Sequence, residues 1–228
     1  MSDDSRRGAD AAPAWSAWRC LAFRFAALYT TLWILPFPVP TWILGATLGW
    51  TPEGLLWGAL VPWVGRAILG LDGAYVAATA SGDTAYSYTF HLLIALLAAI
   101  GAAIWSVRTR RREHRRLYLW WTTLLRFYLV WEILGYGLVK VVGRQFDSGV
   151  LPEELYRTFG DLTPMDLLWG FMGHSWVYSG FTGLAEVVGA VLLLWRRTTA
   201  LGALLLVAVL ANVALLNFCY DVQVKLYS

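Results

Sequence analysis

The stretch LYLWWTTLLRFYLVWEILGYGLVKVV, residues 117–142, is long and apolar enough to cross a membrane, yet it contains three charged side chains. A transmembrane helix needs about 20 mostly apolar residues. A charged side chain at the centre of the bilayer costs about 2.5–3.5 kcal/mol on insertion scales. We therefore expect Arg126, Glu132 and Lys140 to have partners inside the protein or to face a water-filled cavity.

The composition of the whole chain indicates an integral membrane protein. Hydrophobic residues make up 58% of the 228 residues and charged residues only 14%, whereas about a quarter of a typical soluble domain is charged. The chain is predicted to be an all-α, polytopic transmembrane helix bundle. Residues 1–17 form a polar N-terminus without a cleavage pattern, and residues 18–228 form a single transmembrane domain.

Five membrane spans are predicted, at residues 18–36, 86–107, 117–142, 176–195 and 199–218. A further apolar region at 54–71 contains Pro62 and Arg66. We interpret it as an interfacial or re-entrant helix, because proline and charge interrupt it, and a full span is the alternative. A long loop at 143–175, with a short amphipathic helix near 164–172, joins the third and fourth spans.

The basic residues of the loops orient the predicted bundle. With five spans, three arginine-containing segments lie on one side of the membrane: Arg6, Arg7 and Arg19; Arg108, Arg110, Arg111, Arg112, Arg115 and Arg116; Arg196 and Arg197. This side is predicted to be cytoplasmic, so the N-terminus is cytoplasmic and the C-terminus external. The run at 108–116 fits a topology determinant near anionic lipid better than a nucleic-acid site. The outer loop at 143–175 is acidic.

Polar residues at bilayer depth form the candidate site. The proposed buried cluster consists of Arg24, Arg126, Glu132, Glu186 and Asn212. Helix counting places Arg126 within reach of Glu186, and a buried charge strongly favours a partner. Tyr136 and Lys140 are expected near the outer interface, where a lysine can extend to water. Glu132 is left without an assigned partner.

Three interpretations of this cluster remain open from spacing alone. It would hold the helices together, form a quinone-binding or proton-active pocket, or line a hydrated polar pathway. The sequence contains no pattern typical of a metal site, a P-loop or a dinucleotide-binding fold, so no metal is predicted. Cys20 and Cys219 are predicted to lie on opposite sides of the membrane and not to bond to each other.

Two segments resemble the DoxX-like family of integral membrane proteins, in an uncharacterised bacterial branch. They are LLRFYLVWEILGYGLVK at 124–140 and FTGLAEVVGAVLLLWRRTTALGALLLVAVLANV at 181–213. The family features are matched by Arg126, Gly137 with Lys140, Glu186 with Gly189, and Arg197 with Thr198. The long acidic loop and the lack of redox-spaced cysteines depart from the family pattern.

The resemblance implies a four-helix membrane core in spans two to five, with the first span added, in a bacterial inner membrane. It also implies a link to quinone- or thiol-related redox complexes, including a thiosulfate:quinone oxidoreductase subunit. The leading hypothesis is therefore a membrane subunit of such a redox system, with quinone as a candidate cofactor and a redox or assembly protein as a candidate partner. The alternative is a non-catalytic assembly subunit that docks a protein on the outer loop. A small-solute carrier ranks last, because no internal repeat is visible.

Overall fold

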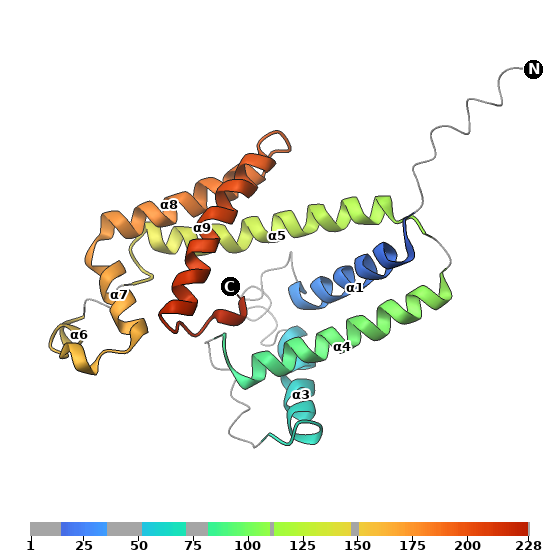
Figure 1. Ribbon diagram of the computed structural model, residues 1–228, viewed down its shortest axis with the longest axis horizontal. Coiled ribbons are helices and arrows are strands. Elements are labelled where there is room, and N and C mark those ends of the chain that lie inside the picture. The colour runs from blue at the N-terminus through green and yellow to red at the C-terminus, as the bar shows by residue number, and fades with distance from the viewer. Residues whose placement is uncertain (1–14, 36–51, 72–81, 110–111, 147–150, 228) are drawn as a thin grey trace, which may run out of the picture. The chain divides into compact units, whose positions relative to one another are not determined.

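The computed structural model describes residues 15–35, 52–71, 82–109, 112–146 and 151–227. Within these ranges all regular secondary structure is helical (Figure 1). The longer helices are α1 (Ala17–Ile34), α3 (Pro52–Ala67), α4 (Ala85–Arg108), α5 (Arg115–Val141), α7 (Pro164–His174), α8 (Trp176–Leu193) and α9 (Thr199–Cys219). The short ones are α6 (Pro152–Leu155), η3 (Phe159–Asp161) and η4 (Lys225–Tyr227). The predicted all-α class is confirmed for this part of the chain.

Each of the five predicted spans coincides with one long helix, namely α1, α4, α5, α8 or α9. Three of these, α4, α8 and α9, are long and apolar enough to cross a membrane. Helices α1 and α5 carry arginines within their apolar sequence, and the count of five spans stays a prediction. The region predicted as an interfacial or re-entrant helix is α3, which contains Pro62 and has Arg66 in its last turn.

The chain divides into two compact units, and helices α4 and α5 contribute to both. The first unit combines the N-terminal part through Leu35 with His91–Thr122, and the second combines Pro36–Phe90 with Thr123–Ser228. The first unit therefore holds α1 and most of α4. The second holds the larger part of α5 together with α7, α8 and α9.

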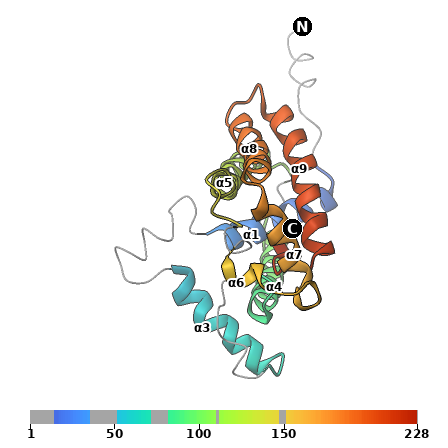
Figure 2. The ribbon, with the colours of Figure 1, turned by 90° about the vertical axis from the view of Figure 1, so that its left-hand side faces the viewer.

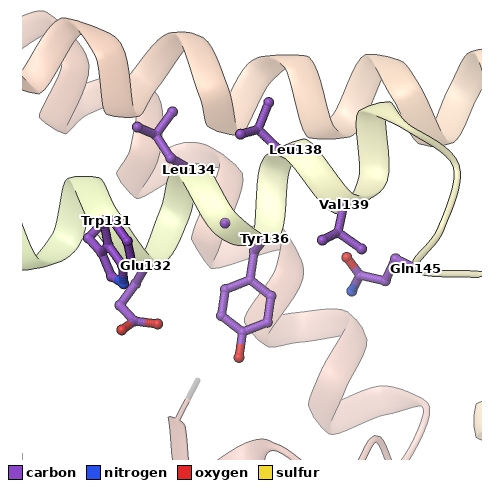
Figure 3. A pocket seen from close by; sticks show the side chains of 8 residues that line it. Trp131, Glu132, Leu134, Tyr136, Leu138, Val139 and Gln145 are labelled. Atoms are coloured by element: carbon purple, nitrogen blue, oxygen red, sulfur yellow. The ribbon is translucent and has the colours of Figure 1, made fainter. Parts of the chain in front are cut away.

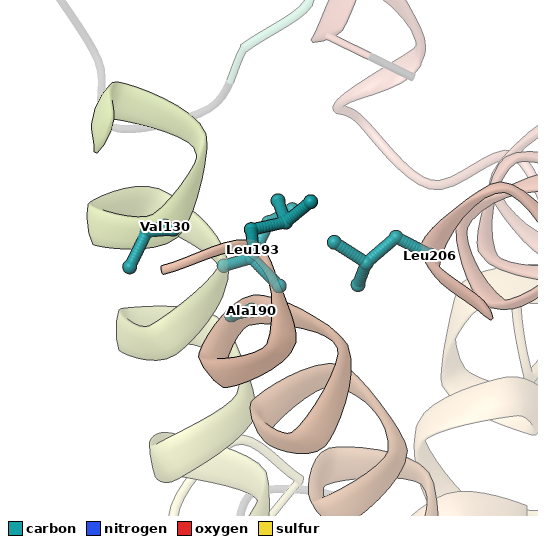
Figure 4. Packing of buried hydrophobic residues seen from close by; sticks show 5 residues of the cluster. Val130, Ala190, Leu193 and Leu206 are labelled. Carbon is teal, nitrogen blue, oxygen red and sulfur yellow. The ribbon is translucent and has the colours of Figure 1, made fainter. Parts of the chain in front are cut away.

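Helices α5, α8 and α9 pack together in the second unit. Helix α8 runs beside α5 in both views of the chain (Figure 1, Figure 2). Their contact surface is an apolar cluster with one or more residues from each helix: Val130, Ile133, Ala190, Leu193 and Leu206 (Figure 4). The turn between α8 and α9 is tied down by Thr198, whose hydroxyl donates to the Leu192 carbonyl over 2.7 Å.

Glycines allow the three helices of this bundle to approach closely. A Cβ atom on Gly183 of α8 would lie 2.6 Å from the carbonyl oxygen of Gly137 on α5 and 2.6 Å from Lys140 Cβ. A Cβ on Gly202 of α9 would lie 2.8 Å from the carbonyl oxygen of Gly189 on α8. Small residues at such contacts are typical of helix association in membranes, where packing rather than water exclusion drives assembly. On α8, Gly183 and Gly189 lie at such close contacts, whereas a Cβ on Gly180 would meet nothing within 4 Å.

Helix α5 ends at Val141 and is followed by a glycine cap at Gly143, three residues after Lys140. Gly143 has a φ of 71°, a conformation that side-chain-bearing residues rarely adopt. Its N–H donates to the Lys140 carbonyl over 3.0 Å, and the Arg144 N–H donates to the Val139 carbonyl over 2.9 Å, as in a Schellman motif. A cation in the last turn of a helix also interacts favourably with the helix dipole. The end of α5 is thereby fixed at the position of Lys140.

The described part of the outer loop is held by local hydrogen bonds. Thr163 and Asp166 form a capping box at the start of α7, and Arg157 forms an ion pair with Asp166 over 2.9 Å. The hydrogen bonds from Thr163, together with Arg157, hold the pKa of Asp166 below its usual range. An apolar cluster joins α7 to the end of the α5 segment and to the C-terminal segment: Phe146, Leu168, Met172 and Val222.

Asp83 connects the start of α4 to the C-terminal segment within the second unit. Its carboxylate accepts hydrogen bonds from the backbone N–H groups of Lys225 and Leu226, at 3.0 Å and 2.9 Å. Its own N–H donates to the Gln223 carbonyl over 3.0 Å. Lys225 also interacts with Asp221 over 2.6 Å, which raises the pKa of the lysine.

The glycine contact between α5 and α8 predicts a difference between two alanine substitutions on the same helix. Gly183→Ala forces its methyl group against the backbone of α5 and should lower the free energy of unfolding by about 1–3 kcal/mol. Gly180→Ala is the matched control, because a Cβ there meets nothing within 4 Å. It should be neutral or stabilise the helix by up to about 1 kcal/mol. Reversible unfolding in detergent measures both, and equal effects would contradict the proposed contact.

Candidate functional site

A buried ion pair joins α5 to α8 beside the glycine contact. Lys140 Nζ donates a hydrogen bond to Glu186 Oε1, and the two side chains are only 7% and 3% exposed. Gly137 lies three residues before Lys140, and Gly183 lies three residues before Glu186. Because residues three apart lie on nearly the same helix face, the crossing that brings the glycines together also brings the two charges together.

The ion pair uses only one of the two carboxylate oxygens of Glu186. Glu186 Oε2 is buried and has no hydrogen-bond partner in the described part of the chain. A buried carboxylate with one satisfied and one unsatisfied oxygen is costly, so Lys140 supplies most of the compensation for its charge. Losing the lysine would leave an uncompensated buried carboxylate.

The predicted pairing of Arg126 with Glu186 is wrong, because Glu186 binds Lys140 instead. The prediction counted depth from the centre of each span. Lys140 lies one residue before the end of α5, whereas Glu186 is near the middle of α8. The two helices are therefore offset along their axes, and the end of α5 faces the middle of α8. Lys140, expected to extend to the outer interface, is buried within the protein.

Arg126 lies beside the turn that joins α8 to α9. Its Nη1 donates to the Thr199 hydroxyl over 3.5 Å, and its guanidinium lies 5.2 Å from the centre of the Phe127 ring. Its Nε is buried and has no hydrogen-bond partner among the described residues. Since Thr199 is the first residue of α9, Arg126 is at the level of the α8–α9 turn.

Glu132 and Tyr136, together with Gln145, line a pocket of about 680 Å³ along α5 (Figure 3). The other lining residues are Trp131, Leu134, Gly135, Leu138 and Val139. Glu132, which had no assigned partner from the sequence, has a side-chain hydrogen bond with Tyr128. Gln145 Oε1 is buried and without a hydrogen-bond partner among the described residues. The pocket thus combines an apolar wall with three hydrogen-bonding side chains.

Arg24 belongs to the first unit and is 4% exposed. It donates from Nε to His114 Nε2 over 3.3 Å, and from Nη1 to the Ser106 hydroxyl over 2.8 Å. Its Nη2 donates to the Thr109 carbonyl over 3.4 Å, and the guanidinium lies 5.6 Å from the Trp105 ring centre. Arg24 therefore has a set of partners of its own, none of which was predicted.

The remaining predicted member of the cluster, Asn212, is exposed on α9. Of the five residues proposed as one buried cluster, the structure brings no two together by a described hydrogen bond or ion pair. The sequence did not indicate several residues that contribute to these sites: Ser106, Thr109, His114, Gln145 and Thr199. Gln145 lies three residues beyond Val142, the last residue of the predicted span, and carries no sequence signal, whereas His114 is the single histidine of the arginine-rich loop.

The described residues contain no group of three His, Cys, Asp or Glu side chains that could hold a metal ion. Both cysteines are free, Cys20 buried and Cys219 exposed. Neither cysteine lines the α5 pocket. The pocket side chains supply hydrogen bonds from carboxylate, phenol and amide groups, and the Glu132 carboxylate can also exchange a proton.

The fold and these sites define a class of protein. The described chain is all-helical, and three of its helices are long and apolar enough to cross a membrane, which indicates an integral membrane protein. Most of its buried charged and polar side chains, including those of Arg24, Lys140 and Glu186, lie on these helices, and ionisable groups within membrane helices commonly serve function.

Comparison with known proteins gives one similar protein and no assigned activity. The chain is 39% identical over 100 residues to the uncharacterised protein YwoB of Bacillus subtilis (strain 168). The match covers 44% of this chain and 62% of YwoB, so it spans less than two thirds of that relative's length. No family model matches the chain, and no solved structure matches it.

The ion pair predicts a strongly non-additive double-mutant cycle. Lys140→Met alone leaves Glu186 buried and uncompensated, and should lower the free energy of unfolding by about 3–5 kcal/mol, as should Glu186→Leu alone. The double variant removes both charges and should cost less than either single change. Reversible unfolding in detergent micelles gives all three values. A double variant that loses the sum of the two single effects would show that the residues do not interact.

Proposed function

We propose that this chain is a DoxX-like integral membrane protein that serves as a membrane subunit of a quinone-linked redox system. The observation that carries the proposal is the pocket along α5, lined by aromatic and aliphatic side chains and by Glu132, Tyr136 and Gln145. Ligand pockets are mostly apolar, with a few polar groups that orient the ligand. A quinone has this composition, since its ring and tail are apolar and its two carbonyl oxygens accept hydrogen bonds.

The three polar side chains suit both redox states of a quinone. The Tyr136 hydroxyl and the Gln145 amide nitrogen are donors for the carbonyl oxygens of the oxidised form. Gln145 Oε1, which has no partner in the described part of the chain, is an acceptor for a hydroxyl of the reduced form. The Glu132 carboxylate is a second acceptor and can take up a proton. A thiol-linked reaction has less support, because neither cysteine lies at this pocket.

The membrane arrangement that goes with this proposal has five spans. Helices α4, α5, α8 and α9 are the DoxX-like four-helix core, α1 is an added span, and α3 is interfacial. In support, α4, α8 and α9 satisfy the length and hydropathy needed to span, and Lys140 on α5 is neutralised inside the protein. The arginine-rich loops support a cytoplasmic N-terminus by the positive-inside rule, and the proposed location, a bacterial inner membrane, follows from the resemblance.

A quinone inventory of the purified protein tests the proposal. Wild-type protein isolated from a bacterial membrane should retain quinone, and Gln145→Leu should reduce the retained amount at least about fivefold, because it removes both a donor and an acceptor. Gln223→Leu is the matched control, since it makes the same chemical change at an exposed position of the C-terminal segment. It should retain as much quinone as the wild type.

The unfolding midpoint of each variant must be measured beside its quinone content. A Gln145→Leu protein that is folded and retains quinone as the wild type does would refute the pocket assignment. A wild-type protein that neither retains nor exchanges added quinone would refute the proposed function as a whole.

A second function, a non-catalytic assembly subunit, is favoured by the outer loop. Its aromatic residues Tyr156 and Phe159 are 89% and 78% exposed. Two of its acidic residues are used locally, Asp161 by the Thr158 hydroxyl and Asp166 by Arg157. The loop therefore exposes two aromatic rings on a segment that local hydrogen bonds and an ion pair hold in place. Exposed aromatic residues are typical of docking surfaces.

The two functions are separated by one experiment with crossed variants. If the loop docks a protein, Tyr156→Ser combined with Phe159→Ser should reduce a co-purifying partner at least about fivefold after cross-linking in native membranes, because the rings supply the apolar contact area. The Gln145→Leu variant should keep that partner. Equal partner recovery from the wild type and the loop variant would exclude docking through these residues.

A further inference from the structure

We infer that Arg126, Arg196 and Arg197 form a site for a phosphate group at the α8–α9 turn. The inference depends on the chain lying in a bilayer and not on the redox function proposed above. It is independent of the α5 pocket, because none of the three arginines is among the residues that line it.

The first observation is that Arg126 is half-buried without a counter-charge. Its described contacts are the Thr199 hydroxyl and the Phe127 ring, which are neutral. No carboxylate of the described chain lies within ion-pair distance of it. Its Nε is also buried without a hydrogen-bond partner in the same residues. A guanidinium stays charged at any physiological pH, so Arg126 presents a positive charge that no described carboxylate neutralises.

The second observation is that helices α5, α8 and α9 contain no acidic residue that could pair with Arg126. Helices α5, α8 and α9 carry only two carboxylates, Glu132 and Glu186. Glu186 is bound to Lys140, and Glu132 lies about 9 Å from Arg126 along the helix axis at 1.5 Å per residue. The cationic group at the α8–α9 turn therefore lacks an internal partner among these helices.

The third observation is the depth of the proposed site in the membrane. Arg126 contacts the first residue of α9, and the exposed Arg196 and Arg197 lie in the turn that leads into that helix. A turn between two spans lies where the lipid phosphates lie, at the boundary of the hydrocarbon core. The N-terminus of α9 adds a partial positive charge. Three arginines at this level supply positive charge and planar N–H donors, which phosphate oxygens bind strongly.

The ligand chemistry is a phosphate, carried by an anionic lipid headgroup or by free phosphate. A lipid phosphate is present at this level in the membrane and its binding needs no entry path. Basic pockets between membrane helices commonly bind anionic headgroups. The partly exposed guanidinium of Arg126 would take the phosphate oxygens together with Arg196 and Arg197.

Native mass spectrometry of the detergent-purified protein tests this site with phosphatidylglycerol and phosphatidylcholine as probes. Wild-type protein should retain phosphatidylglycerol over phosphatidylcholine, and Arg126→Gln should reduce phosphatidylglycerol retention at least about fivefold, since it removes a charged donor. Arg116→Gln is the matched control: it removes an exposed arginine from the same helix, ten residues nearer its start. It should retain the lipid as the wild type does.

The double variant Arg196→Gln with Arg197→Gln keeps Arg126 in place and changes only exposed residues. It should also lose phosphatidylglycerol, so the test stands even if Arg126→Gln fails to fold. Equal losses in the Arg116 control and the site variants would show general charge attraction and overturn the site. Retention unchanged in the site variants would overturn it as well. A thermal shift of delipidated protein with inorganic phosphate, lost in the double variant, would identify free phosphate as the ligand.

Discussion

The close contact of α5 with α8 at Gly137 and Gly183 determines the arrangement of the second unit. Without side chains at these positions, the two backbones approach until Lys140 Cβ would touch a Cβ on Gly183. At that separation the lysine reaches Glu186 within the protein interior. In a bilayer, lipid competes equally with apolar side chains, so close packing and polar contacts give helix association its specificity. The glycine pair and the ion pair supply these two contributions at one place.

This contact fixes the rotation of α5 and thereby gives its three charges different environments. With 100° per residue, Glu132 lies about 80° around the helix from Lys140, so it points away from α8 and into the pocket. Arg126 lies only about 40° from Lys140 in rotation but about 21 Å away along the axis. It therefore meets the start of α9 rather than Glu186. Helix α5 thus contributes Lys140 to the ion pair, Glu132 to the pocket and Arg126 to the α8–α9 turn.

The sequence predicts the helices well and their mutual offset poorly. Hydropathy and glycine or proline boundaries are local properties, and they place all five long helices within a few residues of the observed ends. Periodicity also shows which residues share a helix face. The axial offset of two helices is set by which glycines meet, and no single-helix pattern contains that information. For this reason Arg126 rather than Lys140 was assigned to Glu186, although both lie on a similar face.

The loop-borne partners were missed for a different physical reason. Gln145 and His114 act from segments that flank helix α5, where no periodic pattern singles out one polar residue from its neighbours. His114 is 8% exposed although charged residues surround it in sequence. Burial of one residue in such a loop is a property of the folded unit, and here the aromatic ring of Phe23 stacks on the imidazole at 5.8 Å.

Arg24 and Arg126 show two ways in which an arginine can be accommodated within a membrane protein. Arg24 distributes its donors over a histidine nitrogen, a hydroxyl and a carbonyl. Because a guanidinium can only donate, His114 Nε2 must accept, and the imidazole is neutral with its proton on Nδ1. Arg126 has one long hydrogen bond and an aromatic neighbour. Neutral acceptors satisfy the first arginine within the protein, whereas the second has no described ion-pair partner and lies beside the α8–α9 turn, which is why we infer a phosphate ligand there.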